Sequence, residues 1–209
     1  MGGGVVRYAS VCDGIGAAHA AWMPLGGECA WHAEIDPFPA AVVAQRFAAG
    51  PNLGDITRIT DEQLEQHGPI DLLVGGTPCQ RFSVAGLRQG MADPRGNLAL
   101  VFLRLAQRTR ARRLVWENVP GVLSSNGGRD FGAFLGALVE LGYGFAYRVL
   151  DAQYVRVDGH ARAVPQRRRR VFVVGYLGDW RRDRALGNSM AVNVMRWIGQ
   201  RIQLTEDQC

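Results

Sequence analysis

Residues 70–84 read Ile-Asp-Leu-Leu-Val-Gly-Gly-Thr-Pro-Cys-Gln-Arg-Phe-Ser-Val, and the interpretation of the whole chain starts from them. The apolar run at residues 70–74 is typical of a buried strand, and two glycines separate it from a polar loop that contains Cys79. Pro78 fixes its own φ and biases the preceding residue toward extended geometry, so this loop has few conformations. A strand that ends in a glycine-rich loop with a cysteine is where an open α/β sheet places its chemistry. Taken alone, Cys79 is also explained as a small buried hydrophobe.

The composition of the 209-residue chain, 47% hydrophobic and 21% charged, is that of one ordinary globular domain. No apolar run reaches membrane-spanning length, and the first residues have neither a signal-peptide nor a myristoylation pattern. The chain has four cysteines, Cys12, Cys29, Cys79 and Cys209. Their spacing fits neither a metal site nor a disulfide framework, so we expect no metal and a reducing, cytoplasmic setting.

The basic residues are all arginines, and they are unevenly distributed. The formal net charge is +5, and nine arginines lie between Arg156 and Arg184, including the run at residues 167–170. Such a block is either a solvated face or a surface for a polyanion such as DNA. Charge alone leaves both alternatives open.

The beginning of the chain has the pattern of a nucleotide-binding βα unit. An apolar strand at residues 5–9 is followed by Gly14 and Gly16 and then by a helix of small residues. Glycines here let the backbone approach a ligand, and the helix N-terminus offers free N–H groups. The dinucleotide fingerprint requires a third glycine where His19 stands, so the motif leaves other adenosine-containing ligands open.

An acidic residue follows the second expected strand, at residues 29–33. Glu34 is at the position that accepts hydrogen bonds from ribose hydroxyls. Asp36, which precedes Pro37, could simply cap the helix expected at residues 38–49, and both assignments can hold, with Glu34 on the ribose and Asp36 as the cap.

The remaining chain continues this alternation of strands and helices. Residues 54–57 are expected to lie in a short extended piece and its loop, where Asp55 is either a turn residue or a contact to an adenine amino group. We expect helices at 60–66, 97–110, 130–141 and 190–202 and strands at 113–116, 143–150 and 170–176. This order predicts a doubly wound, mostly parallel α/β sheet in a single domain, residues 1–209, with its core at 5–176.

The candidate ligand loops all follow strands, and we expect them to gather at the carboxyl edge of the sheet. In their order along the chain, these motifs resemble those of the DNA (cytosine-5)-methyltransferase family. The matching segments are Asp13-Gly14-Ile15-Gly16-Ala17, Glu34-Ile35-Asp36, Gly54-Asp55-Ile56, Gly76-Thr77-Pro78-Cys79-Gln80, Glu117-Asn118-Val119, Gln166-Arg167-Arg168-Arg169-Arg170 and Gly187-Asn188-Ser189. Each is weak alone, but the ordered set is specific and covers most of residues 8–202.

The resemblance implies a Rossmann-like methyltransferase that transfers a methyl group from S-adenosyl-L-methionine to C5 of a cytosine flipped out of DNA. It assigns Cys79 as the nucleophile at C6, Glu117 as the acid at N3, and Arg170 as the group that holds O2. Arg168 would support the Cys79 loop or contact a phosphate. The cofactor contacts that it implies are Asp13, Gly14, Ile15, Gly16, Glu34, Ile35, Asp55, Ile56, Pro78, Asn188 and Ser189.

Two departures from the family pattern qualify this resemblance. Cys12 and Asp13 stand where the family usually has a phenylalanine that packs on the adenine. Between residues 177 and 186 the family carries a target-recognition domain, which so few residues cannot form. The cofactor motif and helix at 187–203 follow directly. We therefore expect a partner chain or a further segment to supply target recognition.

Two other functions compete with this one. A non-catalytic module that binds S-adenosylmethionine or DNA, or a degenerate remnant of the enzyme, would fit the missing recognition segment. A nicotinamide oxidoreductase would share the first βα unit but would leave Cys79 and the arginine run without a role. The combination of Cys79, Glu117 and Arg170 favours the methyltransferase.

Overall fold

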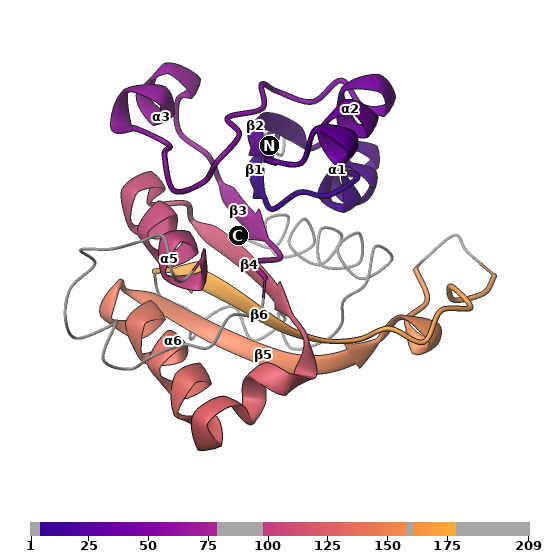
Figure 1. Ribbon diagram of the computed structural model, residues 1–209, viewed down its shortest axis with the longest axis vertical. Helices are drawn as coiled ribbons and strands as arrows, with labels where there is room; N and C mark the ends of the chain where they lie inside the picture. Colours follow the sequence, from indigo (N-terminus) through magenta and orange to yellow (C-terminus); the bar gives the residue numbers. More distant parts are fainter. Residues whose placement is uncertain (1–4, 79–97, 158–160, 179–209) are drawn as a thin grey trace.

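One six-stranded sheet organises the protein, with strand order β2-β1-β3-β4-β6-β5. The structure is a computed structural model, which describes residues 5–78, 98–157 and 161–178 (Figure 1). Cys79, Asn188 and Ser189 lie outside the described residues, as does the helix expected at 190–202. No helix in the described ranges is long and apolar enough to cross a membrane.

Strands and helices alternate along the chain, as the hydrophobic pattern predicts. The strands are β1 (Arg7–Val11), β2 (Glu28–Ala33), β3 (Leu72–Gly75), β4 (Arg113–Asn118), β5 (Tyr143–Asp151) and β6 (Arg169–Leu177). The α-helices are α1 (Ala17–Trp22), α2 (Pro37–Arg46), α3 (Asp61–His67), α5 (Leu98–Thr109) and α6 (Arg129–Glu140). Short 3₁₀ helices are η1 (Met23–Leu25), η3 (Pro120–Leu123), η4 (Ser125–Gly128) and η5 (Ala152–Tyr154).

The pairing of the strands confirms the expected doubly wound, mostly parallel sheet. β1 pairs in parallel with β2 and β3, and β3 pairs in parallel with β4. β6 is antiparallel to both of its neighbours, β4 and β5. Because β6 reverses direction, its first residues lie at the edge where β4 and β5 end. The arginines that precede and begin β6 therefore reach the same edge as the loop after β1.

The strands are buried on both faces, because residues alternate between two hydrophobic clusters. Leu73 and Leu114 face the cluster formed with α5 and α6, whereas their neighbours Leu72 and Val115 face the cluster that contains α1. Figure 1 shows α1 beside β1 and β2, and α5 and α6 near β4 and β5. A two-residue period with both faces apolar is what a covered parallel sheet requires.

Sequence-local signals explain where the helices begin. The side chain of Thr60 accepts a hydrogen bond from the backbone N–H of Gln63, and the side chain of Gln63 accepts one from the backbone N–H of Thr60. This pair of bonds is a capping box at the beginning of α3. The Asp36 side chain accepts from the Phe38 backbone N–H at 3.0 Å and caps α2. The assignment of Asp36 as a helix cap is therefore confirmed.

In the segment expected to be a short extended piece and its loop, the chain makes an isolated bridge at Asn52 with His32 and then turns at Ile56 and Thr57. The expected end of the third strand was wrong, because β3 includes Gly75, which was expected to break it. A Cβ at Gly75 would lie 2.7 Å from Val11 and 2.9 Å from Phe102, so glycine allows this strand to pack closely.

We expect the substitution Gly175→Ala to lower the free energy of unfolding by about 1–3 kcal/mol, because it overpacks the core. A Cβ at this position in β6 would lie 2.7 Å from Cγ of Leu114, which is fully buried and has no room to move. Urea unfolding followed by circular dichroism measures the change. As a control, Gly136→Ala in α6 meets nothing within 4 Å and should stabilise by about 0.5–1 kcal/mol. If the free energy of unfolding changed in the same direction in both variants, the packing argument would be contradicted.

Candidate active site

A cavity of about 530 Å³ opens at the carboxyl edge of the sheet. Its walls come from the loop after β1, the end of β3, the end of β4 and the residues that precede and begin β6. The lining includes Ser10, Val11, Cys12, Asp13, Gly14, Ile15, Ala17, Ala18, Val74, Gly75, Gly76, Glu117, Val164, Gln166, Arg168, Arg170 and Phe172. The cavity therefore joins the glycine loop to the acidic motif and to the arginine run.

The loop after β1 has an unusual backbone. Cys12, Gly14 and Gly16 all have positive φ, with values of 51°, 55° and 88°. Such angles favour glycine, so the strained non-glycine position is Cys12. A Cβ added to Gly14 would meet nothing within 4 Å, and Gly14 lines the cavity. Gly16 is packed instead, because a Cβ there would lie 2.7 Å from the Phe47 ring.

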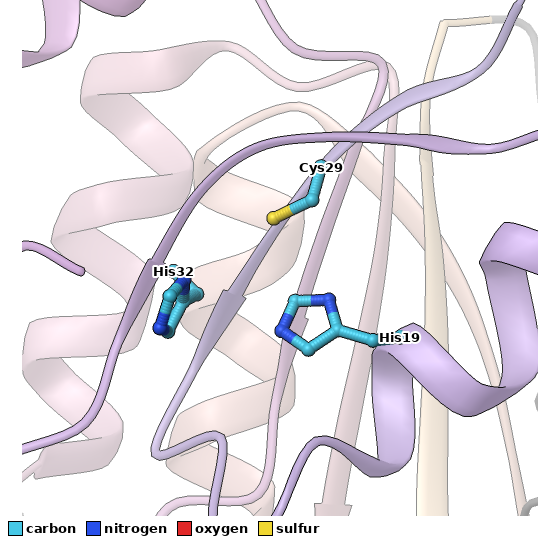
Figure 2. Close-up of side chains that lie close together, drawn as sticks. All are labelled: His19, Cys29 and His32. Atoms are coloured by element: carbon cyan, nitrogen blue, oxygen red, sulfur yellow. The ribbon is translucent and has the colours of Figure 1, made fainter. Parts of the chain in front are cut away.

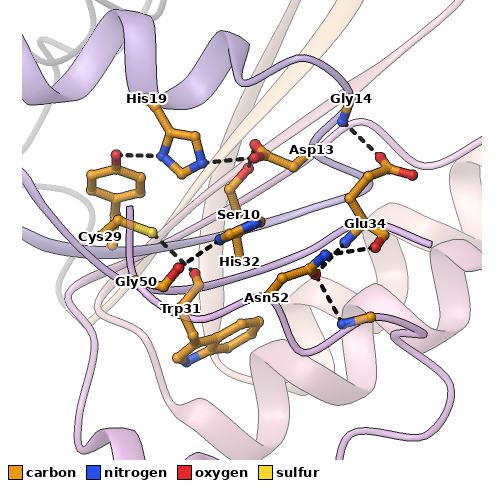
Figure 3. A network of polar contacts seen from close by, with 12 residues as sticks. Ser10, Asp13, Gly14, His19, Cys29, Trp31, His32, Glu34, Gly50 and Asn52 are labelled. Carbon is orange, nitrogen blue, oxygen red and sulfur yellow. Dashed lines mark hydrogen bonds and ion pairs between the residues drawn. The ribbon is translucent and has the colours of Figure 1, made fainter. Parts of the chain in front are cut away.

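A buried polar network supports this loop from inside the protein (Figure 3). The Asp13 side chain accepts from Ser10 Oγ at 2.5 Å and contacts His19 Nε2 at 2.7 Å. The other ring nitrogen of His19 is 2.8 Å from the Tyr8 hydroxyl. His19 thus stands at the third-glycine position because its side chain ties α1 to the loop. In the sequence, His19 stands out only as a departure from the dinucleotide fingerprint, and no local pattern indicates its partners.

His19, Cys29 and His32 form a cluster whose possible metal-ligating atoms all lie within 4.8 Å of one another (Figure 2). Each side chain already has a protein partner: Cys29 donates to the carbonyl of Trp31 at 3.3 Å, and His32 Nδ1 donates to that of Gly50 at 2.9 Å. Burial raises the pKa of Cys29 to about 11 and lowers the pKa of His32. These contacts account for the cluster as hydrogen-bonded core residues.

Glu34 lies beside the glycine loop. Its Oε2 accepts from the N–H of Gly14 at 2.8 Å, and its Oε1 accepts from the N–H of Asp36 at 2.9 Å. The Asn52 side chain bonds both the N–H and the C=O of Glu34 and also accepts from the N–H of Gly54. Asn52 is a site residue that the sequence analysis missed, because its role depends on a bridge between distant segments.

The structure gives the side chain of Asp55 a local role. It accepts from the backbone N–H of Thr57 at 2.9 Å and from its hydroxyl at 2.8 Å, and these bonds lower the pKa of Asp55. This geometry supports its assignment as a turn residue, while a contact to adenine stays a prediction. Ile56 is buried in the core, whereas Ile15 and Ile35 are exposed by 57% and 74%. Apolar surface is thus available on the segments that carry the expected cofactor contacts.

Glu117, at the end of β4, binds two arginines from the other side of the cavity. Its Oε1 is 3.1 Å from Nε of Arg170 and 3.3 Å from an Nη of Arg168. Only 24% of its side chain is exposed. A Cβ at Gly76 would lie 3.2 Å from the other carboxylate oxygen, so the glycine makes room for Glu117. The three residues therefore form one charged group.

The beginning of the loop that carries Cys79 is fixed to β4. Trp116 donates from Nε1 to the hydroxyl of Thr77 at 2.9 Å, and Asn118 donates from Nδ2 to the carbonyl of Thr77 at 3.0 Å. Pro78 follows and is exposed. Asn118 stands next to Glu117 in the acidic motif, which was the available signal for a role that the sequence analysis did not assign.

The cavity thus includes Asp13, Gly14 and Ile15 of the predicted cofactor loop together with Glu117, Arg168 and Arg170. Glu34 contacts this loop but does not line the cavity. Asp55 and Ile56 do not line the cavity either. The predicted positions at Cys79, Asn188 and Ser189 fall outside the described residues.

Solved structures with the same architecture include methyltransferases. Dnmt2 of S. pombe superposes with a TM-score of 0.65 and 20% identity, covering 84% of this chain and 53% of that one. A DNMT2 variant of Spodoptera frugiperda gives a TM-score of 0.64 and 22% identity over 83% and 50% of the two chains. The fold is therefore the α/β methyltransferase fold.

Sequence comparison defines the family more closely. The family model described as C-5 cytosine-specific DNA methylase matches residues 6–183, and the chain belongs to this family. Type II methyltransferase M.MspI of Moraxella sp is 31% identical over 83% of this chain and 39% of its own length. A DNA N-6-adenine-methyltransferase of Escherichia phage P1 is 42% identical over 80% of this chain and 28% of its own length. The chain thus spans less than half the length of these relatives.

We expect Asp13→Asn to lower the free energy of unfolding by about 1–3 kcal/mol, because one buried donor loses its acceptor. The carboxylate of Asp13 faces Ser10 and His19, whereas an amide has only one acceptor oxygen. Chemical unfolding measures the change. The control is Glu140→Gln, which alters an exposed carboxylate at the end of α6. Unfolding of Asp13→Asn at the same urea concentration as the parent would refute this role.

Proposed function

We propose that this chain is the catalytic part of an enzyme that transfers a methyl group from S-adenosyl-L-methionine to C5 of cytosine in DNA. The observation that carries the proposal is the single cavity that holds both the glycine loop and the Glu117–Arg168–Arg170 group. Membership of the C-5 cytosine-specific DNA methylase family supports the same reaction. A module without catalytic function gives no reason for a carboxylate and two arginines to converge there.

The residues present fit the proposed cofactor. A cavity of about 530 Å³ is within the range of small-molecule sites. Gly14 has open space where a side chain would stand. The carboxylate of Glu34 accepts a hydrogen bond from the backbone N–H of Gly14. Ribose hydroxyls would compete with this N–H for the carboxylate. The acids on this side also suit a positively charged sulfonium. When bound, S-adenosylmethionine would supply an electrophilic methyl group.

C5 of cytosine requires activation before it can accept a methyl group. The proposed nucleophile is Cys79: its thiolate forms a bond to C6, and the electrons of the C5=C6 double bond become available at C5. C5 would then bond to the methyl carbon as the methyl–sulfur bond breaks, with S-adenosylhomocysteine as the leaving group. Loss of the C5 proton to a base and cleavage of the bond from Cys79 to C6 would regenerate the aromatic ring and the thiolate.

Glu117 and its arginines are assigned to the other side of the base. Addition at C6 increases negative charge on the ring, and a proton or hydrogen bond delivered by Glu117 at N3 stabilises it. Arg170 orients Glu117 through the 3.1 Å contact and is proposed to hold O2 of the base. Arg168 makes the second contact to Glu117 and is more exposed, which suits a neighbouring phosphate.

Methylation of adenine at N6 is the second candidate, because the relative from phage P1 carries that name. The match covers only 28% of that relative, so most of it lies outside the shared region. An exocyclic amine can attack a methyl group without a cysteine adduct, and N6 chemistry therefore leaves the Cys79 motif without a role. The shared region fits the cytosine reaction better.

DNA is the proposed partner, and target recognition is assigned to a segment or partner chain outside the described residues. The loops of the cavity supply chemistry, whereas sequence is read by groups that reach base edges. A reducing, cytoplasmic setting is also proposed, because Cys12 and Cys29 are free thiols.

We expect S-adenosylhomocysteine to bind this chain without DNA, and Glu34→Ala to weaken that binding by about 1–3 kcal/mol through lost ribose hydrogen bonds. Titration calorimetry measures both. The matched control is Asp36→Ala, which removes the cap of α2; it should lower stability by about 0.5–2 kcal/mol and leave affinity unchanged. Absence of heat for the parent at millimolar ligand would exclude the cofactor assignment.

We also expect 5-fluorocytosine in DNA, with S-adenosylmethionine present, to trap a covalent adduct on Cys79. Fluorine at C5 blocks the final elimination, and a mismatched target lowers the cost of extruding the base. Glu117→Gln should slow adduct formation by about 10²-fold or more, while Glu140→Gln should leave the rate unchanged. Peptide mass spectrometry locates the adduct and its time course gives the rate.

The other described cysteines are poor alternatives for this adduct. Burial raises the pKa of Cys12 to about 12, and the nearby carboxylates of Glu34 and Asp13 add to the shift. The pKa of Cys29 is also raised, to about 11. Both thiols are therefore protonated at neutral pH. An adduct mapped to Cys12 or Cys29, or a Glu117→Gln rate equal to that of the parent, would contradict the assignment.

A further inference from the structure

An open hollow of about 940 Å³ lies at the end of the β5–β6 hairpin, outside the candidate active site. It is formed by the last residues of β5, by η5 and by the residues around the beginning of β6. We call it the arginine hollow, and its charged residues are Arg148, Asp151, Arg156, Arg167 and Arg169. Neither the proposed reaction nor the cofactor site uses these side chains.

The hollow has an excess of positive charge, because it has four arginines and one aspartate. The carboxylate of Asp151 accepts from the backbone N–H of Arg168 and from the Gln153 side chain, both at 2.9 Å. These bonds hold the loop, and the charge of Arg167 also acts on the same carboxylate. The ion pairs among the described residues do not include Arg156, Arg167 or Arg169. Several guanidinium groups thus face solvent together in a concave surface.

The arginine hollow is adjacent to the candidate active site, because one segment of chain serves both. Arg168 and Arg170 line the catalytic cavity, whereas the alternating residues Arg167 and Arg169 line the hollow. β6 begins at the edge where β5 ends, and Figure 1 shows this end of the hairpin projecting beyond the other strands. The two sets of arginines point to opposite sides of this segment, so a DNA strand whose base enters the cavity would pass around the end of the hairpin to reach the hollow.

An exposed aromatic side chain lies in the same hollow. Tyr154, in η5, is 81% exposed, which is the largest exposed fraction among the large apolar and aromatic residues described. A tyrosine beside arginines is a frequent arrangement at nucleic-acid surfaces, because it offers an aromatic face to a base or sugar.

We propose that the arginine hollow binds the phosphate backbone of the DNA strand that carries the target base. This inference rests on the proposed function and adds to it the path of the flanking phosphates. Guanidinium groups match phosphate geometry, and a backbone of regularly spaced charges fits a row of arginines next to a base pocket. The contacts would position the strand without reading its sequence.

The test measures the affinity of the 209-residue chain for a fluorescent duplex at increasing salt, by anisotropy. The variant combines Arg156→Gln, Arg167→Gln and Arg169→Gln, and the control is Arg110→Gln. Arg110 is exposed just before β4 begins, at the opposite edge of the sheet. We expect the plot of log affinity against log salt to become shallower by about one unit for each arginine that contacts a phosphate, and equally for unrelated sequences. Tyr154→Leu should weaken binding without changing the slope.

The outcomes separate this inference from the proposed function. A slope like that of the parent in the triple variant, or an equal loss in Arg110→Gln, would overturn the role of the hollow even if Cys79 forms its adduct. A shallower slope would support the hollow even if no adduct forms, since binding is measured without chemistry. At saturating DNA, the triple variant should form the adduct at the parental rate; a rate reduced as much as in Glu117→Gln would show that these arginines belong to catalysis and overturn the positioning role.

Discussion

The register between β3 and β4 is the constraint on which the candidate active site depends. Gly75 pairs with Trp116, so the next residues of the two strands, Gly76 and Glu117, emerge side by side. A slip by one residue would turn the Glu117 side chain to the opposite face of the sheet. The hydrogen bonds from Trp116 and Asn118 to Thr77 reinforce this register beyond the last pair of the ladder. The same short strand therefore delivers the acid and fixes the entry to the proposed nucleophile loop.

The elements of this fold could be predicted from the sequence because its apolar periods are clear. Strands such as β4, with consecutive apolar residues, and helices such as α5, with one apolar face, require only local information. Two features could not be read in this way. The antiparallel direction of β6 depends on which strand it meets, and the turn after Asn52 depends on a bridge to His32, in β2. Both are decided by contacts between segments far apart in the chain.

The candidate site followed the same division, because its motif residues could be predicted from the sequence and its long-range contacts could not. Glu117, Arg168 and Arg170 could be assigned from the order of motifs, and the structure brings their side chains together. The support for the glycine loop could not be assigned, because the partners of His19 are Asp13, nearby in sequence, and Tyr8, which the strand pattern marked only as apolar. A glycine at position 19 would pack closely, whereas this chain fills the space with a buried histidine. Its hydrogen bonds then replace close packing as the means of holding a backbone with several positive φ angles.

The cavity also has an electrostatic polarity that bears on which cysteine can react. Asp13 and Glu34 lie around the glycine loop, and their negative charge adds to burial in raising the pKa of Cys12 to about 12. Arg168 and Arg170 lie across the cavity at Glu117. Acids near a thiol disfavour its thiolate, whereas cations favour it. A side that suits a sulfonium is thus unsuitable for a nucleophile, even though Cys12 lines the same cavity. The proposed reaction needs both a site for the sulfonium and a reactive cysteine. This separation of charge explains why the cysteine is expected in the loop after β3 and not in the loop after β1. The loop after β3 begins beside Glu117.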